Sequence, residues 1–118
     1  MNNVGMPAAM LLDMWCRNVN EAFDGQCYLV GSATQKGDWR DVDVRLILTD
    51  EVWERWFPGL LPITAQLDIT WVVLCTALSQ SASVATGLPV DFQIQQMTYA
   101  NEKYAKSRSP LGLVRMRR

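Results

Sequence analysis

Histidine is absent from this chain of 118 residues. Its absence excludes Ser-His-Asp and Cys-His catalysis, imidazole acid–base chemistry and histidine-ligated zinc. Any catalysis would therefore depend on carboxylates, lysines, hydroxyls or metal ions held by carboxylates. The cysteines are few and odd in number, they form no C-x-x-C motif, and each lies in an apolar run: Cys16, Cys27 and Cys75. This pattern predicts buried free thiols in a reducing compartment.

Long apolar runs and targeting signals are also lacking. The longest apolar run, residues 69–78, is shorter than the roughly 20 residues that cross a bilayer. No basic segment precedes the first apolar stretch, as it would in a signal peptide. We therefore expect a cytoplasmic protein without a membrane partner. The length fits a single domain, and the 49% share of apolar residues is enough for a hydrophobic core.

Charge is distributed unevenly along the chain, although the net charge is only −1. Residues 103–118 contain no acid and six basic residues: Lys103, Lys106, Arg108, Arg115, Arg117 and Arg118. We divide the chain into one domain, residues 1–106, and a basic C-terminal tail, residues 107–118. Three interpretations of the tail stay open. It is a solvated terminus, a segment that binds RNA or DNA through counterion release, or a segment whose arginines fold back on a bound triphosphate.

Hydrophobic periodicity predicts the elements of the first half. Apolar residues at helical spacing predict a helix over residues 8–23 that ends near Asp24-Gly25. A short strand follows over residues 26–30. Strict alternation of Val and Leu with charged residues predicts a strand with one buried face over residues 42–48. Asp50 is expected to cap a short helix that ends at Trp56.

The second half repeats this pattern. We expect a long helix over residues 64–85, an alternating strand over residues 90–95 and a last short helix over residues 99–106. The order α-β-β-α-α-β-(α) predicts an α/β (α+β) domain with a small mixed β-sheet and helices packed on one face.

Two carboxylates stand at the start of the second strand. Asp41 and Asp43 share one face of the strand because side chains alternate with period two, and their Cα atoms lie about 6.6 Å apart. Carboxylates at this spacing can converge on metal ions, and ligation by oxygen alone suits Mg²⁺. Asp91 lies on the polar face of the later strand. If the two strands are neighbours, all three carboxylates meet in one patch.

A Gly-Ser turn precedes this pair. Gly31 lets the backbone approach a ligand and point N–H groups at it, and Ser32 adds a hydroxyl donor. Lys36 and Arg40, in the loop between the turn and the pair, can neutralise phosphate charge. The turn and the carboxylates together predict a site for the phosphates of a nucleoside triphosphate.

The run GSATQKGDWRDVDV followed by PVDFQI resembles the polymerase-β-like nucleotidyltransferase superfamily, especially its minimal, stand-alone members. That family has a Gly-Ser turn after its first strand, a D-x-D motif on the second and a lone Asp on a later strand. The resemblance covers roughly residues 8–96. The loop between turn and pair is slightly shorter here than in the family. The helical domain that often binds base and acceptor is not found in the chain.

The resemblance implies transfer of a nucleoside monophosphate from a nucleoside triphosphate to a hydroxyl acceptor, with release of pyrophosphate. It implies two Mg²⁺ ions, for which Mn²⁺ can substitute. The acceptor stays unidentified: it is a protein, a nucleic acid such as RNA, or a small molecule. A partner chain or a second copy would supply the missing surface. By position, the catalytic and metal-binding residues are Asp41, Asp43 and Asp91, and the nucleotide-binding residues are Gly31, Ser32, Lys36 and Arg40.

A hypothesis from another class remains open. The chain would then be a non-catalytic nucleotide-binding or protein-interaction module with the same fold: a regulator, a decoy or an antitoxin-like partner. In that case Asp41 and Asp43 lie at the solvent-exposed beginning of a strand, and Asp91 is a polar residue of an edge strand. Retention of all three aspartates favours the enzyme, because a decayed site has no physical reason to keep like charges together.

Overall fold

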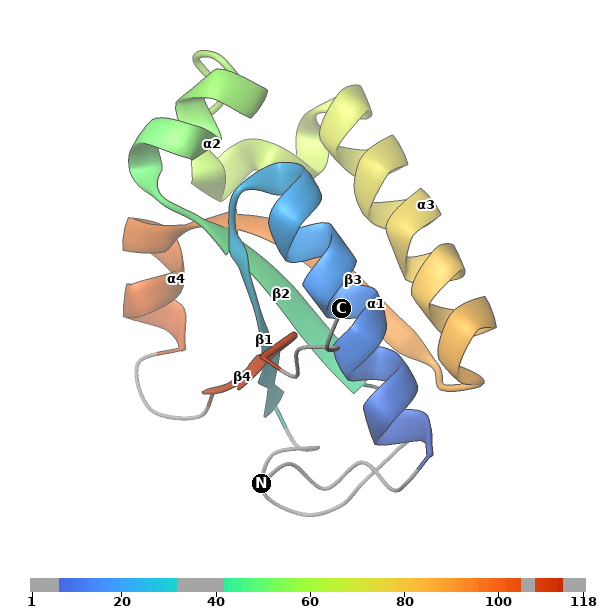
Figure 1. The fold of residues 1–118 in the computed structure, drawn as a ribbon. Helices are drawn as coiled ribbons and strands as arrows, with labels where there is room; N and C mark the ends of the chain where they lie inside the picture. The colour runs from blue at the N-terminus through green and yellow to red at the C-terminus, as the bar shows by residue number, and fades with distance from the viewer. Residues whose placement is uncertain (1–6, 32–41, 105–107, 114–118) are drawn as a thin grey trace.

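The computed structural model describes residues 7–31, 42–104 and 108–113 (Figure 1). Four strands form one mixed sheet in the order β3-β2-β1-β4. Strand β1 (Gln26–Val30) is antiparallel to β2 (Val42–Leu48) and to β4 (Arg108–Leu111), and β2 is parallel to β3 (Val90–Gln96). The helices are α1 (Ala8–Phe23), α2 (Asp50–Trp56), α3 (Ile69–Thr86) and α4 (Met97–Lys103). The predicted α+β fold with a small mixed sheet is confirmed.

The hydrophobic core lies between one face of the sheet and α1 and α3. The even-numbered residues of β2, from Val42 to Leu48, are all buried on this face, which confirms the predicted alternation. Leu12 and Cys16 of α1 pack against them. Phe92 of β3 meets Trp15 of α1 edge-to-face, with ring centroids 5.4 Å apart.

Strand β3 is an edge strand, and serines of α3 bind its outer backbone groups. The Oγ of Ser79 accepts a hydrogen bond from the N–H of Phe92 (2.8 Å) and donates one to the carbonyl of Phe92 (3.2 Å). The Oγ of Ser83, one turn further along the helix, accepts from the N–H of Val90 (3.1 Å). These side chains satisfy backbone groups that an edge strand otherwise exposes.

The same row of α3 continues toward the N-terminus of the helix. The Sγ of Cys75 accepts from the N–H of Ile94 (3.4 Å), and the indole N–H of Trp71 donates to the carbonyl of Ile94 (2.9 Å). Four α3 residues at a spacing of four therefore follow β3, because residues four apart lie on the same helix face. Helix α3 thus covers the edge of the sheet as well as part of its face.

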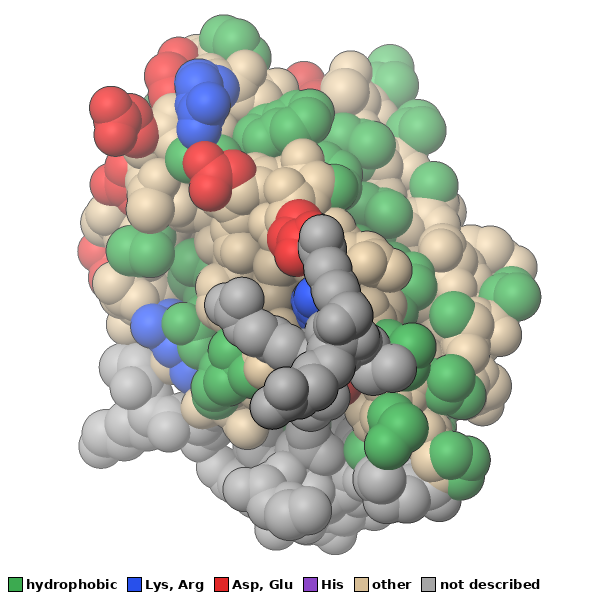
Figure 2. All heavy atoms as spheres, viewed as in Figure 1, with side chains coloured by type: hydrophobic (Ala, Val, Ile, Leu, Met, Phe, Trp, Pro, Cys, Tyr) green, Lys and Arg blue, Asp and Glu red, His purple; other side chains and the backbone are tan. Residues whose placement is uncertain are grey.

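The outer side of α3 is apolar and exposed. Figure 2 shows hydrophobic side chains over this helix on the right of the molecule, and Ile69, Val73 and Val84 are each more than half exposed. In the described part of the chain, α3 is the one helix whose length and mean hydropathy of 1.3 also suit a membrane span. Core helices pass the same test, so this is weak evidence. The absence of a membrane partner stays a prediction.

Three helix starts differ from those predicted. The last helix begins at Met97 and not at residue 99, and it ends at Lys103. The long helix begins at Ile69 and not at residue 64, because Pro62–Leu67 forms a 3₁₀ segment. Asp68 caps α3, and its carboxylate accepts from the N–H of Trp71 (2.9 Å).

Helix α2 is capped by Thr49, so the prediction that Asp50 caps it was wrong. The Oγ1 of Thr49 accepts from the N–H of Val52 (3.3 Å). Asp50 instead accepts from the N–H and the hydroxyl of Thr98 (3.1 and 2.6 Å), which ties α2 to the first turn of α4.

The three cysteines are buried and free, as predicted. Burial raises the pKa of Cys75 to about 11. A hydrogen bond to Cys27, together with burial, raises the pKa of Cys16. Both thiols therefore stay protonated at neutral pH, and neither has the thiolate character that a nucleophilic cysteine requires.

Candidate functional site

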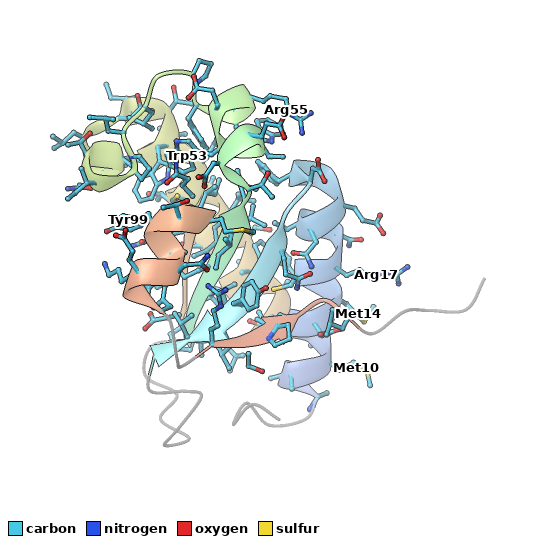
Figure 3. All side chains as sticks on the ribbon, turned by 90° about the vertical axis from the view of Figure 1, so that its left-hand side faces the viewer. Met10, Met14, Arg17, Trp53, Arg55 and Tyr99 are labelled. Carbon is cyan, nitrogen blue, oxygen red and sulfur yellow. The ribbon has the colours of Figure 1, made fainter. Side chains whose placement is uncertain are left out.

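The second face of the sheet, which we call the polar face, carries the odd-numbered residues of β2 and β3. Helix α4 lies on this side of the sheet and α1 on the other (Figure 3). Exposure falls along β2 toward α4: Asp43 is half-buried, Arg45 is 6% exposed and Ile47 is 2% exposed. The end of the polar face that begins at Asp43 is therefore its open end.

Strand register aligns four residues across this open end, and we call them the charged row. Arg108 of β4 pairs with Val30 of β1, Val30 pairs with Asp43 of β2, and Asp43 pairs with Asp91 of β3. Neighbouring strands lie about 4.8 Å apart. The structure thus brings together Asp43 and Asp91, which are far apart in sequence, at a separation that a shared ligand can bridge.

Gly31 lies against the carboxylate of Asp43. Its φ is +78°, a left-handed conformation that glycine adopts without a steric penalty. A Cβ atom at this position would lie 2.8 Å from Oδ2 of Asp43. Any side chain at residue 31 would therefore displace the carboxylate. The structure therefore places the glycine of the predicted Gly-Ser turn beside the charged row.

Arg45 is a buried cation that lies two residues further along β2 than Asp43, on the same face of the sheet. Its guanidinium donates to the carbonyls of Asp91 (2.8 Å) and Val44 (3.1 Å), and its Nε lies 3.3 Å from the hydroxyl of Tyr104. One Nη also lies 3.5 Å from Oδ2 of Asp91. Arg45 thus partly offsets the negative charge of the row. Sequence reasoning treated it only as part of an alternating pattern.

Arg108, at the other end of the row, is the second residue that sequence reasoning missed. Its guanidinium lies over the ring of Tyr28, 4.7 Å from the centroid. Its Nη1 is buried and has no hydrogen-bond partner among the described residues. Arg108 lies two strands from Asp43 in the register, with Val30 between them. A cation with an unused donor in the same row as two carboxylates suits a phosphate oxygen. Sequence reasoning assigned Arg108 only to the basic tail, because a four-residue strand has too little alternation to recognise.

The remaining predicted site residues lie outside the described residues: Ser32, Lys36, Arg40 and Asp41. Within the described ranges, no three Asp, Glu, Cys or His side chains are grouped to hold a metal ion. Asp43 and Asp91 supply two oxygen ligands of the kind that Mg²⁺ prefers. The chemistry of these two oxygen donors fits part of a magnesium site.

Comparison of the chain with protein-family models, curated proteins and solved structures finds no match. A functional proposal therefore depends on the chemistry of the charged row itself. That row combines two neighbouring carboxylates, a glycine that abuts one of them and an arginine with an unused donor.

Proposed function

We propose that the chain is a magnesium-dependent nucleotidyltransferase, similar to the polymerase-β-like superfamily, that transfers a nucleoside monophosphate from a nucleoside triphosphate to a hydroxyl acceptor. The observation that carries the proposal is the register match of Asp43 with Asp91 beside Gly31. It brings together, on one face of a sheet, parts of three motifs that are widely separated in the sequence.

The residues divide into three roles. Asp41, Asp43 and Asp91 would hold Mg²⁺, which supplies charge stabilisation and lowers the pKa of the acceptor hydroxyl when it is bound. Gly31 and Ser32 would direct donors at the triphosphate, and Lys36, Arg40 and Arg108 would bind phosphate oxygens. Arg45 holds Asp91 in place.

The reaction needs no histidine. The acceptor hydroxyl releases its proton to water, its oxygen forms a bond to the α-phosphorus, the bond from that phosphorus to the bridging oxygen breaks, and pyrophosphate leaves. The work of the chain is to place the reactants and stabilise charge, as in phosphoryl transfer generally.

A non-catalytic nucleotide-binding module is the second candidate, and one observation favours it. Asp91 already has a cationic partner in Arg45, 3.5 Å away. The charged row is therefore partly neutralised without a metal ion. Such a module would bind nucleotide and release no pyrophosphate.

Calorimetric titration with each of the four nucleoside triphosphates, in Mg²⁺ and in EDTA, tests the proposal. We expect binding that requires Mg²⁺. Incubation with α-³²P-labelled triphosphate and a cell extract then separates the two candidates, because only an enzyme transfers label to protein or RNA. Failure of all four triphosphates to bind would contradict both.

The variant Arg108→Met tests the phosphate role of Arg108. Methionine keeps apolar contact with Tyr28 and loses the guanidinium donors. We expect affinity for Mg²⁺-triphosphate to fall about tenfold or more, the size of a hydrogen bond to a charged group. The matched control is Arg55→Met, because Arg55 is 67% exposed and makes a surface ion pair with Asp24. Equal affinity in the Arg108 variant and wild type would remove Arg108 from the site.

A further inference from the structure

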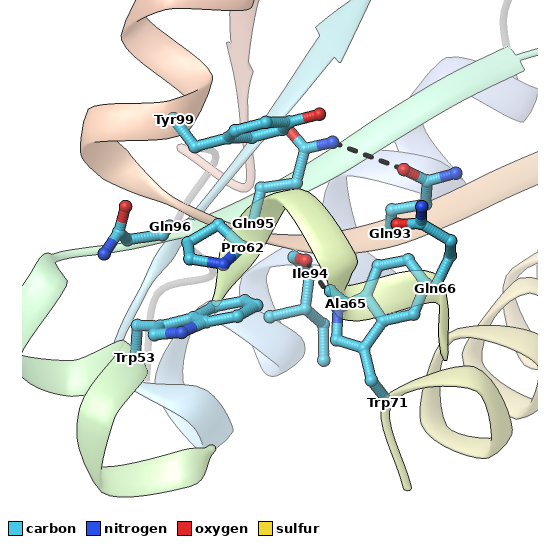
Figure 4. A pocket seen from close by; sticks show the side chains of 10 residues that line it. All are labelled: Trp53, Pro62, Ala65, Gln66, Trp71, Gln93, Ile94, Gln95, Gln96 and Tyr99. Atoms are coloured by element: carbon cyan, nitrogen blue, oxygen red, sulfur yellow. Dashed lines mark hydrogen bonds between the residues drawn. The ribbon is translucent and has the colours of Figure 1, made fainter. Parts of the chain in front are cut away.

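A second polar cluster lies at the edge of β3, near the end of the strand that α4 covers, and residues of both faces of the sheet line it. We call it the amide hollow (Figure 4). Its walls include three aromatic side chains and several glutamines, and none of its lining residues is charged. Those used below are Trp71, Tyr99, Gln66, Gln93 and Gln95.

Gln95 carries an unused acceptor in this hollow. The residue is only 5% exposed, and its Nε2 donates to Oε1 of Gln93 at 3.3 Å, the contact drawn as a dashed line in Figure 4. Its Oε1 is buried and has no hydrogen-bond partner among the described residues. Buried polar atoms are almost always paired. An unpaired acceptor on the wall of a hollow therefore points to a ligand that brings an N–H or O–H donor.

The size of the amide hollow limits what can enter. It offers about 40 Å³ to the centres of water-sized molecules. By the same measure a buried water needs roughly 10–15 Å³. The hollow therefore takes about three or four waters or the edge of one small planar group, and not a whole nucleotide.

A larger hollow adjoins it and extends to the charged row. This neighbour offers about 160 Å³ by the same measure, and Asp91 and Thr76 are among its lining residues. Both hollows share Trp71 and Gln93 as walls. The two hollows follow one another along β3 from Asp91 to Gln95, which are about 13 Å apart along the strand, and we call them together the groove. An extended nucleoside triphosphate has a comparable length.

We propose that this groove holds the nucleoside of the substrate, and that Oε1 of Gln95 accepts a hydrogen bond from the exocyclic amino group of adenine or cytosine. The inference rests on the proposed function, because it needs the phosphates to lie at Asp91. An uncharged hollow with aromatic walls suits an uncharged planar base. Guanine and uracil carry a carbonyl oxygen where adenine and cytosine carry the amino group. In guanine or uracil, that carbonyl oxygen would lie opposite Oε1 of Gln95, and two acceptors form no hydrogen bond with each other.

Two matched ligand pairs test the role of Gln95 in the wild-type chain. ATP and ITP, and likewise CTP and UTP, differ at this position in having an amino group or a carbonyl oxygen. In Mg²⁺, we expect the amino member of each pair to bind about three- to tenfold more tightly, the range of one neutral hydrogen bond. Equal affinities within both pairs would overturn the inference.

The variant Gln95→Met assigns the preference to the residue. Methionine has a similar length and no acceptor oxygen, so the preference should vanish. The melting temperature of the free protein should change little, because loss of the hydrogen bond from Nε2 to Gln93 offsets the removal of an unpaired buried acceptor. The matched control is Gln66→Met, an exposed glutamine on the wall of the same hollow, which should keep the preference. A preference that persists in Gln95→Met would overturn the assignment.

Tripolyphosphate separates failure of this inference from failure of the proposed function. It carries the phosphates and lacks the base, so its Mg²⁺-dependent binding reports on the charged row alone. Binding of tripolyphosphate without discrimination between the paired nucleotides would overturn the base site and leave the proposed function standing. No binding of tripolyphosphate would contradict the proposed function. In that case, comparing the affinities of adenosine and inosine would test the role of Gln95 without phosphates. Equal affinities would overturn that role.

Discussion

Asp43→Asn is expected to weaken Mg²⁺-dependent triphosphate binding by at least about 100-fold, because even residues behind the ligands of a metal site often account for 10–100-fold. The substitution keeps the shape of the side chain and removes the charge that attracts the metal ion. The substitution also removes the like-charge repulsion between Asp43 and Asp91, a contribution that favours the folded metal-free protein. Calorimetry and thermal unfolding measure the two effects on the same samples.

Asp91→Asn should weaken binding as well but with a different effect on stability. Arg45 is buried and lies 3.5 Å from Oδ2 of Asp91. Removing that charge leaves a buried cation with one partner fewer, which costs free energy of folding. The side chain of Asp91 is 53% exposed, so solvent screening limits this loss to about 1 kcal/mol or less. The two aspartates are therefore distinguishable by melting temperature, although both should lose binding.

The matched control for both variants is Asp24→Asn. Asp24 lies at the end of α1 with a φ of +59°, which asparagine tolerates, and its ion pair with Arg55 is exposed. Neutralising it changes the net charge by the same amount without touching the charged row. Triphosphate binding that survives Asp43→Asn would move the metal site away from this row. A large drop in melting temperature would instead show that Asp43 holds the fold together.

The elements of the fold were largely predictable because their signals are local. Strand β2 alternates between apolar and charged residues, and the structure buries the apolar positions as predicted. Helix α1 carries apolar residues at helical spacing and ends before Asp24-Gly25, as predicted. Both patterns record which side of an element faces the core.

Long-range pairing was less predictable. The sequence predicted that Asp43 and Asp91 lie close together only if β2 and β3 are neighbours. The sheet order in the structure establishes that they are. The place of Arg108 depends on β4 joining the free edge of β1, a contact between segments far apart in the chain that no local pattern encodes. The partners of Arg45 come from β3 and from the end of α4. Sequence reasoning could name the aspartates and not the arginines that surround them.

Helix α3 shows how tertiary contacts change the meaning of a residue. In the sequence, Ser79 and Ser83 resemble outward-facing polar residues of an apolar helix. In the structure they face β3 and bind its backbone. The start of α3 was also misplaced, because Pro62–Leu67 continues the helical pattern in a 3₁₀ segment before Asp68 caps the helix.

Replacing Ser79 and Ser83 together with alanine is expected to destabilise the protein by about 2–4 kcal/mol. The change leaves the N–H and the carbonyl of Phe92 without partners, while the N–H of Val90 keeps the carbonyl of Leu88 at 3.0 Å. Each unpaired group costs about 1–3 kcal/mol before partial hydration reduces the loss. Alanine favours the helix itself more than serine does. Helix propensity alone therefore predicts that the double variant is more stable than wild type. Urea denaturation followed by circular dichroism measures whether the variant gains or loses stability.

Thr76→Ala is the matched control for the helix. Thr76 is an exposed hydroxyl residue of the same helix, and alanine has the higher helix propensity, so a slight stabilisation is expected there. Stability equal to that of Thr76→Ala would show that α3 is held by apolar contacts alone. A loss of several kcal/mol in the free energy of unfolding would instead show that the hydrogen bonds from Ser79 and Ser83 to β3 are needed to hold α3 against the edge of the sheet.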